Sequence, residues 1–323
     1  MALCAAFLLQ RTVFWVLYSG FTGPVEIQTV INTVNQANYQ MRKHIFLSSV
    51  LILVAAGAGC SLFDDGQAEL DERFAEHNSS SPVEVDHSDW QVVLDDYLEP
   101  DTESGVNLFD YEGLVDDGRE PLDEYVAALE AIDPLTLNEQ EQLAYWINLY
   151  NSLTVQLILD NYPLKSITKV GSNPLKFGPW DEISTEINGS ELSLNDIEHR
   201  IIRPKFNDYR IHFAVNCASI GCPSLATEAY QGASLDTQLD QAADDFLNHP
   251  RGLQFQDNKL QLSKLFEWYA DDFGDSQSSI LATLAKHTDP ETQSALASYN
   301  GSPAYEYDWG LNGLCSEDGA CGE

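Results

Sequence analysis

The chain has 323 residues, of which 44% are apolar and 11% aromatic, enough for a hydrophobic core and far from the composition of a disordered chain. Its formal net charge is −35 at pH 7, a field that repels phosphate backbones, so nucleic acid is excluded as an expected partner. Because the acidic residues are spread along the chain, we attribute them to solubility in a salty habitat.

An export signal is predicted over residues 41–60. It combines a basic Arg42-Lys43 pair with an apolar stretch that is too short to span a bilayer. Gly57-Ala58-Gly59 stands directly before Cys60, so we expect lipoprotein signal peptidase to cleave there and the Cys60 thiol to carry a lipid. The alternatives are an ordinary signal peptide or an anchor that stays attached, and both also export the domain.

Residues 1–40 precede this signal and contain a second apolar run, so we expect Met41 to be the true start. If residues 1–40 are translated, residues 2–21 are the alternative membrane segment. Removing residues 1–60 takes away three basic residues and one acidic residue, which leaves 13 Lys and Arg against 50 Asp and Glu, a charge of −37. Ser61 is not the aspartate that retains lipoproteins in the inner membrane, which predicts an outer-membrane anchor facing the periplasm.

The remaining chain is predicted to hold an acidic linker at 61–86, a globular domain at 87–310 and a Cys-containing tail at 311–323. Helix and strand patterns interleave in the domain without regular βαβ spacing, which predicts a single α+β domain with a small mixed or antiparallel sheet. In chain order we predict helix 88–98, strand 106–111, helices 121–132 and 138–162, an extended segment 177–187 with a turn at Asn188-Gly189, helix 193–202, strand 209–216, helix 235–248, a hairpin of 253–255 with 260–262 about Asp257-Asn258, and helix from Leu265.

The strongest helix prediction begins at Asn138, which can cap the helix together with Glu141. Apolar residues lie on nearly every side of this helix, which is expected of a helix buried all round. A rotation of about 100° per residue puts the side chains of Asn148 and Asn151 on one side. These amides either hold the backbone of a neighbouring loop or line a polar cavity, because a buried amide needs partners.

The predicted strand 209–216 places His212 and Asn216 on one face and ends at Cys217. A cysteine beside an imidazole is a setting for a nucleophile, because a thiolate needs a lowered pKa. His199 is a second candidate base, since Asp196 and Arg203 lie within one helical turn of it. The same spacing also fits a plain surface charge cluster.

A disulfide is the competing interpretation of Cys217. Four cysteines follow Cys60, namely Cys217, Cys222, Cys315 and Cys321, and an exported protein meets an oxidising compartment. Three pairings are possible, and the local ones, Cys217 with Cys222 and Cys315 with Cys321, require the least ordering of the chain. A labile disulfide would join the two interpretations.

Three segments carry a resemblance to a known family: AYWINLYN at 144–151, DIEH at 196–199 and HFAVNCASIGCP at 212–223. With Trp268-Tyr269 and Tyr307-Asp308-Trp309, they resemble the family catalogued as domain of unknown function 547, over about residues 88–310. The resemblance implies no established activity. Glutaredoxin-like modules in some animal members point to thiol chemistry.

The chain contains no nucleotide-binding fingerprint, no CxxC and no HExxH, so no cofactor and no metal are expected. One hypothesis is a cysteine-dependent hydrolase or acyl-transferase with Cys217 as nucleophile and His212 or His199 as base. In it, one of three amides orients the base or holds an oxyanion: Asn148, Asn151 or Asn216.

The other hypothesis is a non-enzymatic envelope binding or scaffold module with a structural Cys217–Cys222 disulfide. The nucleophile hypothesis departs from the order in papain-like enzymes, where the cysteine usually precedes the histidine, because here both candidate histidines precede Cys217. The expected partners are the membrane, through the lipid on Cys60, and an unidentified substrate or envelope protein.

Overall fold

The computed structural model describes residues 69–100, 103–171 and 178–314, all within the second of two compact units, residues 62–323. The predicted signal with Cys60, the upstream residues 1–40, and Cys315 and Cys321 lie outside the described residues. None of the described helices is both long enough and apolar enough to cross a membrane.

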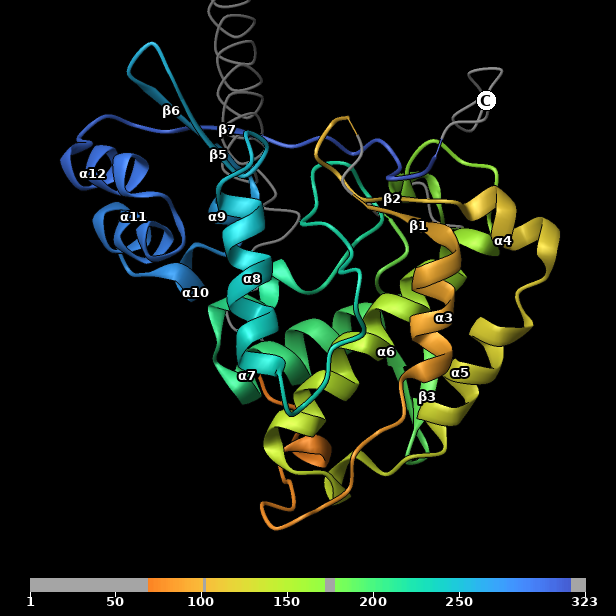
Figure 1. The fold of residues 1–323 in the computed structure, drawn as a ribbon. Coiled ribbons are helices and arrows are strands. Elements are labelled where there is room, and N and C mark those ends of the chain that lie inside the picture. Colours follow the sequence, from red (N-terminus) through yellow and green to blue (C-terminus); the bar gives the residue numbers. More distant parts are fainter. Residues whose placement is uncertain (1–68, 101–102, 172–177, 315–323) are drawn as a thin grey trace, which may run out of the picture. The chain divides into compact units, whose positions relative to one another are not determined.

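The predicted central helix is α6 (Glu139–Leu159), around which the larger hydrophobic core is built (Figure 1). It begins as expected, because the Asn138 side chain accepts a hydrogen bond from the backbone N–H of Glu141 at 3.0 Å. Every residue from Glu141 to Val155 is buried. A helix surrounded on all sides can present polar side chains only to other parts of the protein, which makes it a suitable support for a site.

The N-terminal helices cover α6 on one side: α3 (Ser88–Tyr97), α4 (Tyr111–Asp117) and α5 (Glu120–Glu130). The predicted helices at 88–98 and 121–132 are confirmed. The predicted strand at 106–111 is shortened to β2 (Leu108–Phe109), which pairs antiparallel with β1 (Leu98–Glu99).

The described part of the predicted linker, residues 69–86, packs onto the domain. Phe74 is buried, with its ring centroid 5.2 Å from that of Trp146. The Lys205 ammonium donates hydrogen bonds to three consecutive carbonyls at 74–76. The folded part therefore begins before the predicted boundary at residue 87. The sequence did not indicate this, because Phe74 is a single buried apolar side chain in a mainly polar segment.

The predicted turn at Asn188-Gly189 is confirmed. It joins β3 (Ile183–Ile187) to β4 (Ser190–Ser193), and both turn residues have positive φ, 51° and 71°. The following helix has the reciprocal Ser193–Asp196 cap that the sequence predicts. Its main part, η4 (Asp196–Ile202), is wound as a π-helix and continues into α7 (Arg203–Phe206).

The prediction of a strand over residues 209–216 is wrong. Residues Tyr209–Phe213 form a short 3₁₀ helix, η5, which Asp208 caps by accepting the N–H of Arg210. The alternation of polar and apolar residues misled the prediction, since every residue from 211 to 216 is buried and neither side faces solvent. The alternation of polar and apolar residues in this segment therefore does not reflect the two faces of a strand.

The C-terminal part holds a second hydrophobic cluster and the remaining sheet. The predicted helix 235–248 is α8 (Leu235–Leu247), and the predicted hairpin is β5 (Leu253–Gln256) with β6 (Lys259–Ser263). A parallel strand, β7 (Ala304–Glu306), joins β6, so the described strands form two antiparallel pairs and one mixed sheet. The helices that follow β6 are α9 (Leu265–Trp268), α10 (Ala270–Phe273), α11 (Gln277–Leu284) and α12 (Pro290–Ser298).

The last described segment runs back along the loop that carries Cys217 and Cys222. Gly221 donates its N–H to the carbonyl of Asp308 at 2.8 Å, and Leu311 forms an isolated antiparallel β-bridge with Ser219. Residues 311–314, which the sequence assigns to the tail, are thus bound to the domain. The α+β prediction is confirmed, with the long buried helix at its centre.

Candidate functional site

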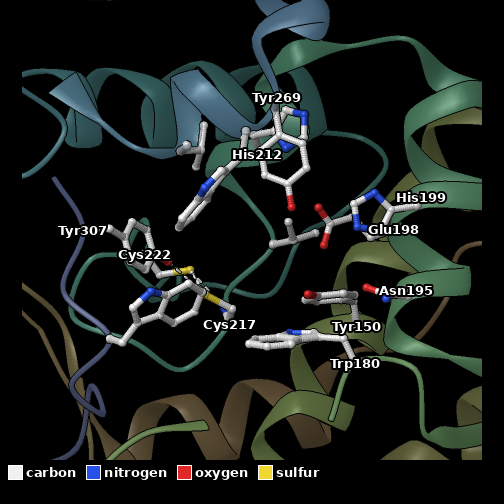
Figure 2. Close-up of a pocket in the computed structure, with 14 residues that line it drawn as sticks. Tyr150, Trp180, Asn195, Glu198, His199, His212, Cys217, Cys222, Tyr269 and Tyr307 are labelled. Atoms are coloured by element: carbon white, nitrogen blue, oxygen red, sulfur yellow. Dashed lines mark hydrogen bonds between the residues drawn. The ribbon is translucent and has the colours of Figure 1, made fainter. Parts of the chain in front are cut away.

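A small pocket brings together residues from six places in the chain (Figure 2). Its cavity volume is about 60 Å³, far less than the 300–1,000 Å³ of a typical drug-sized site. It is lined by Tyr150, Trp180, Asn195, Glu198, His199, His212, Val215, Cys217, Cys222, Leu265, Trp268, Tyr269, Tyr307 and Trp309.

The two cysteines form one side of the pocket. The Sγ atoms of Cys217 and Cys222 are 2.7 Å apart as two free thiols, so the predicted disulfide between them is absent from this structure. Cys217 Sγ also lies 3.1 Å from the Tyr307 hydroxyl and 3.3 Å from the Ser219 hydroxyl. Cys217 is half-buried and Cys222 is buried, so Cys217 is the more accessible thiol.

The loop between the cysteines is held by side chains at both of its ends. Asn216 accepts the N–H of Ala218 and donates to the carbonyl of Pro223, each at 2.8 Å. Ala218 adopts a left-handed conformation with φ 55°, an uncommon backbone state for a residue with a Cβ. Gly221 is needed for close approach, because a Cβ there would lie 2.7 Å from the backbone nitrogen of Asp308.

The three predicted amides do not line the pocket. Asn151 accepts the N–H of Asn216 at 2.8 Å and donates to the carbonyl of Ala214 at 3.0 Å. Asn148 forms the same pair of bonds with the backbone of Tyr230. The hydrogen bonds therefore agree with the interpretation that the amides on α6 hold loop backbone. Their effect on the site is indirect, because they fix where the cysteine loop begins.

Cys222 is the thiol better placed to ionise. Burial disfavours its thiolate, but hydrogen bonds from the Cys217 thiol and backbone N–H, together with the charge of Arg251, lower the pKa of Cys222. The hydrogen bond to Cys222 and burial raise the pKa of the Cys217 thiol well above its ordinary value. Cys222 is therefore the first of the two thiols to lose its proton, and Cys217 keeps its own.

Arg251 has a role that the sequence did not indicate. Its guanidinium donates to the carbonyl of Ile220 and to the hydroxyl of Ser224, so it contacts the loop on both sides of Cys222. Among the described residues no carboxylate forms an ion pair with Arg251, and the groups whose charge would raise the pKa of Arg251 are Cys222 and Tyr307. A Cys222 thiolate is thus the negative charge that this guanidinium can balance.

The facing side of the pocket contains a network of charged and aromatic groups. Asp272 accepts hydrogen bonds from Arg203 Nε at 2.7 Å and from His212 Nε2 at 2.6 Å. Burial opposes ionisation of Asp272, but its bonds to His212 and Arg203 hold the pKa of Asp272 well below its ordinary value. The ring of Tyr269 stacks on His212, with 4.1 Å between centroids.

His199 belongs to the same network. Its Nδ1 lies 2.7 Å from an Arg203 guanidinium nitrogen, as the predicted four-residue spacing suggested. Asp196, the other predicted neighbour, instead bonds to Ser193 and Arg200. His199 is therefore part of a partly buried network and not of a plain surface charge cluster.

Glu198 is a pocket residue that sequence reasoning did not select. It is only 6% exposed, and the Tyr269 hydroxyl is directed at its carboxylate (Figure 2). Burial raises the pKa of Glu198, but His199, His212, Arg203 and Tyr269 outweigh it and lower that pKa overall. Its only signal in the sequence is its place in the DIEH motif, directly before His199. Wound as a π-helix, η4 directs both residues into one pocket, as π-helical turns often do at functional sites.

The structure thus brings Cys217, Cys222, His199 and His212 into one pocket, as the nucleophile hypothesis requires. It does not join them as a dyad: among the described residues, no hydrogen bond connects either imidazole to Cys217, whose partners are Cys222, Ser219 and Tyr307. The described residues also contain no cluster of three His, Cys, Asp or Glu side chains that could hold a metal ion.

Comparison with protein families gives one match. Residues 134–247 match the model of the family described as "Protein of unknown function, DUF547". This range contains all three motifs and both cysteines of the pocket, but it is shorter than the expected 88–310 and omits Tyr269 and Tyr307. Comparisons with curated proteins and with solved structures find no match. The resemblance of this chain to the DUF547 family is therefore confirmed over residues 134–247.

Proposed function

We propose that this domain is a thiol–disulfide exchange enzyme whose reaction centre is Cys217 and Cys222. The observation that carries the proposal is the 2.7 Å separation of the two sulfur atoms inside a pocket. Two thiols this close can close into a disulfide with little movement, which is the property that a dithiol reaction centre requires.

The proposed reaction begins from the singly deprotonated pair, in which Cys222 is a thiolate and the remaining proton is on Cys217. Cys217 passes this proton to the Cys222 thiolate and attacks one sulfur of a substrate disulfide. The attack forms a mixed disulfide on Cys217 and releases a thiolate, which takes the proton back from Cys222. The Cys222 thiolate then attacks the Cys217 sulfur, closes the 217–222 disulfide and releases the second thiol, which takes its proton from solvent.

Two electrons pass from the protein dithiol to the substrate disulfide in this sequence. An external dithiol returns the two electrons to the protein by the reverse of these steps. In that reverse direction, the oxidised protein oxidises a substrate dithiol. Cys217 is the entry point because it is the more exposed sulfur, and Cys222 is the resolving group because its thiolate is the stabilised one.

The second candidate is the cysteine-dependent hydrolase or acyl-transferase, with Cys217 as nucleophile. The pocket network of Glu198, His199 and His212 favours it, because thiol exchange alone does not need these groups. It requires a movement that brings an imidazole to the sulfur. A non-enzymatic module with a permanently closed disulfide requires that neither cysteine be reactive in the native protein.

The proposed setting is the periplasmic side of the outer membrane, with the chain attached through a lipid on Cys60. The pattern of residues 41–60 and the identity of Ser61 support this setting. A partner there would be an envelope protein or a small thiol. Both can form disulfides in this oxidising compartment, and disulfides are the substrates of a thiol–disulfide exchange enzyme.

The test is a redox titration of the purified protein with Cys315 and Cys321 replaced by serine. The protein is equilibrated in buffers of reduced and oxidised dithiothreitol, and its free thiols are alkylated. Mass spectrometry of the Cys217 and Cys222 peptides then gives the fraction of each cysteine that was reduced. We expect both cysteines to convert together in one reversible two-electron transition. A pair that stays fully reduced or fully oxidised in every buffer contradicts the proposal, and a fast reaction of Cys217 with an ester or thioester substrate favours acyl transfer.

A further inference from the structure

The two pocket thiols are enclosed. Cys222 is buried, Cys217 is half-buried, and the cavity beside them has a volume of about 60 Å³. Thiol–disulfide exchange requires one sulfur to reach the sulfur that it attacks, so its rate depends on access. A cavity this small admits a side chain from a narrow segment of chain, but not the surface of a folded protein. Exchange with a folded partner therefore requires a carrier that reaches Cys217.

Residues 307–314 run along the loop that carries the two cysteines. The N–H of Gly221 bonds to the carbonyl of Asp308 at 2.8 Å, and the N–H of Asn312 bonds to the carbonyl of Ala218 at 3.2 Å. The segment is thus attached near both ends of the cysteine loop, and it holds its position there through backbone hydrogen bonds.

Side chains of the same segment approach the reactive sulfur. The Tyr307 hydroxyl lies 3.1 Å from Cys217 Sγ. The Asn312 amide is 1% exposed and lies 3.5 Å from the side-chain oxygen of Asn216. The N–H of Leu314 bonds to the carbonyl of the last residue of β2 at 3.0 Å. The last described residues are therefore fixed beside the start of the cysteine loop.

Cys315 and Cys321 follow this segment directly in the sequence. An extended chain spans at most about 3.6 Å per residue, so the Cα atom of Cys315 lies within about 11 Å of that of Asn312. By the same measure, the Cα atom of Cys321 can lie up to about 22 Å from that of Cys315. Since the backbone of Asn312 is bonded to the residue after Cys217, chain length allows a tail cysteine to contact the Cys217 sulfur.

We propose that Cys315 and Cys321 are the exchange partner of Cys217 within the same chain, and that they carry electrons between the pocket thiols and disulfides of folded proteins that cannot enter the pocket. This inference rests on the proposed thiol exchange for its chemistry, and it names the partner of that reaction centre.

The transfer begins with the reduced pocket pair and a disulfide between Cys315 and Cys321. Cys217 passes its proton to the Cys222 thiolate and attacks one tail sulfur, which breaks the tail disulfide and forms a mixed disulfide. The released tail thiolate takes the proton from Cys222. The Cys222 thiolate then attacks the Cys217 sulfur and closes the pocket disulfide, and the second tail thiolate takes a proton from solvent. Two electrons have passed to the tail, which passes them to a partner disulfide by the same exchange.

The experiment uses two variants of the full chain that lack the resolving cysteine through Cys222→Ser. Adding Cys321→Ser leaves Cys217 with Cys315, and adding Cys315→Ser leaves Cys217 with Cys321. Each variant is equilibrated in buffers of reduced and oxidised glutathione and then alkylated. Mass spectrometry of the cross-linked peptides measures the disulfide between Cys217 and the tail, and separates it from any disulfide of Cys4 or Cys60.

We expect at least one variant to form this disulfide, with an effective concentration of the tail thiol of about 1 mM or more. In 8 M urea the effective concentration should fall about 10–100-fold, because the ends of a loop of about a hundred residues must then meet without the docked segment. Mixed disulfides with glutathione alone in both variants, or equal effective concentrations in buffer and in urea, would overturn the tail as partner.

Gly221→Ala tests the docked segment itself. A Cβ at Gly221 would lie 2.7 Å from the backbone nitrogen of Asp308, so the segment must move away. The effective concentration should then fall about tenfold or more. Gly189→Ala is the control, because it strains a turn with positive φ but its Cβ meets no atom within 4 Å. An effect of Gly221→Ala no larger than that of Gly189→Ala would contradict the role of residues 307–314.

The unmodified protein provides a measurement that needs no variant. The reduced chain is re-oxidised and quenched with N-ethylmaleimide at intervals, and we expect a transient disulfide between the Cys217 peptide and the tail peptide. Its absence at every interval would overturn the tail as partner. If the pocket pair still titrates with Cys315 and Cys321 replaced by serine, thiol exchange stands without the tail. If that pair does not titrate while Cys217 bonds to the tail, only the proposed dithiol centre is contradicted.

Discussion

The backbone N–H of Cys217 donates a hydrogen bond to the sulfur of Cys222 at 3.0 Å. An N–H that points at a sulfur stabilises the thiolate over the thiol. Together with the Arg251 guanidinium beside the loop, this bond lowers the pKa of Cys222 and makes it the more acidic member of the pair. The more exposed cysteine and the more acidic cysteine are thus different residues, and the sequence could not separate them.

Replacing Arg251 with glutamine should raise the pKa of Cys222. Loss of an opposite charge near an ionisable group shifts its pKa by about one unit or more. The measurement is the pH dependence of Cys222 alkylation by iodoacetamide, followed by mass spectrometry of the Cys222 peptide. Arg200→Gln is the control, because that guanidinium bonds to Asp196 away from the cysteine loop. An unchanged pH profile in the Arg251 variant would contradict a role of Arg251 in stabilising the thiolate.

Asp272→Asn should destabilise the protein by about 3 kcal/mol, because breaking one partner of a buried ion pair leaves the other charge uncompensated. The side chains of Arg203 and Asp272 are only 6% and 11% exposed. Asp271→Asn is the matched control, since Asp271 is the exposed neighbour of the same residue type. Urea unfolding at pH 7 measures both variants, and equal effects would contradict a structural role for this ion pair.

The pH dependence of the Asp272 contribution follows from its lowered pKa. A carboxyl group with a lowered pKa in the folded state stabilises the fold at pH values above its unfolded pKa, near 4. The contribution should therefore be constant from about pH 5 upward and decline as the solution becomes more acidic. The difference in unfolding free energy between the native protein and Asp272→Asn, measured from pH 7 to pH 3, should shrink below pH 4.

Asn151→Leu should cost about 2–4 kcal/mol. The substitution removes two buried hydrogen bonds and leaves the N–H of Asn216 and the carbonyl of Ala214 without their side-chain partner. Asn161→Leu, at an exposed position after α6, should change stability by less than about 0.5 kcal/mol. Because Asn216 begins the cysteine loop, the Asn151 variant should also change the alkylation rate of Cys217. A stable variant with normal thiol reactivity would contradict the supporting role.

His87 should make the protein less stable in mild acid. It is 1% exposed, its Nδ1 lies 2.6 Å from the Tyr125 hydroxyl, and burial lowers the pKa of His87 to about 4. The unfolded chain takes up a proton near pH 6.5, whereas the folded protein does not until about pH 4, so acidification favours unfolding. The expected loss between pH 7 and pH 4 is about 3 kcal/mol.

The test is the slope of unfolding free energy against pH for the native protein and for His87→Gln. The variant should lose less stability over this range, while His77→Gln, at a half-buried position, should follow the native protein. Parallel slopes in all three proteins would contradict a neutral buried His87.

Local signals in the sequence were sufficient for much of the fold. The Asn138 cap, the Asn188-Gly189 turn and the Ser193–Asp196 cap depend on neighbours a few residues away, and all three occur as predicted. The segment before Cys217 was mispredicted because its alternation suggested a strand face that does not exist. Phe74 was placed in a linker because a single apolar anchor does not change the composition around it.

The sequence by itself determined that this is an acidic α+β domain with a buried helix at 138–162 and a thiol motif at Cys217 and Cys222, because periodicity, capping and motif order are local properties. Only the tertiary structure decided which groups share the pocket. Glu198 and Tyr307 line it, while Asp272 and Arg251 contact its histidine and its cysteine loop from outside, and Tyr307 is 90 residues from Cys217 in the sequence. The choice of thiolate, base and counter-ion depends on distances and burial, which no local pattern in the chain encodes.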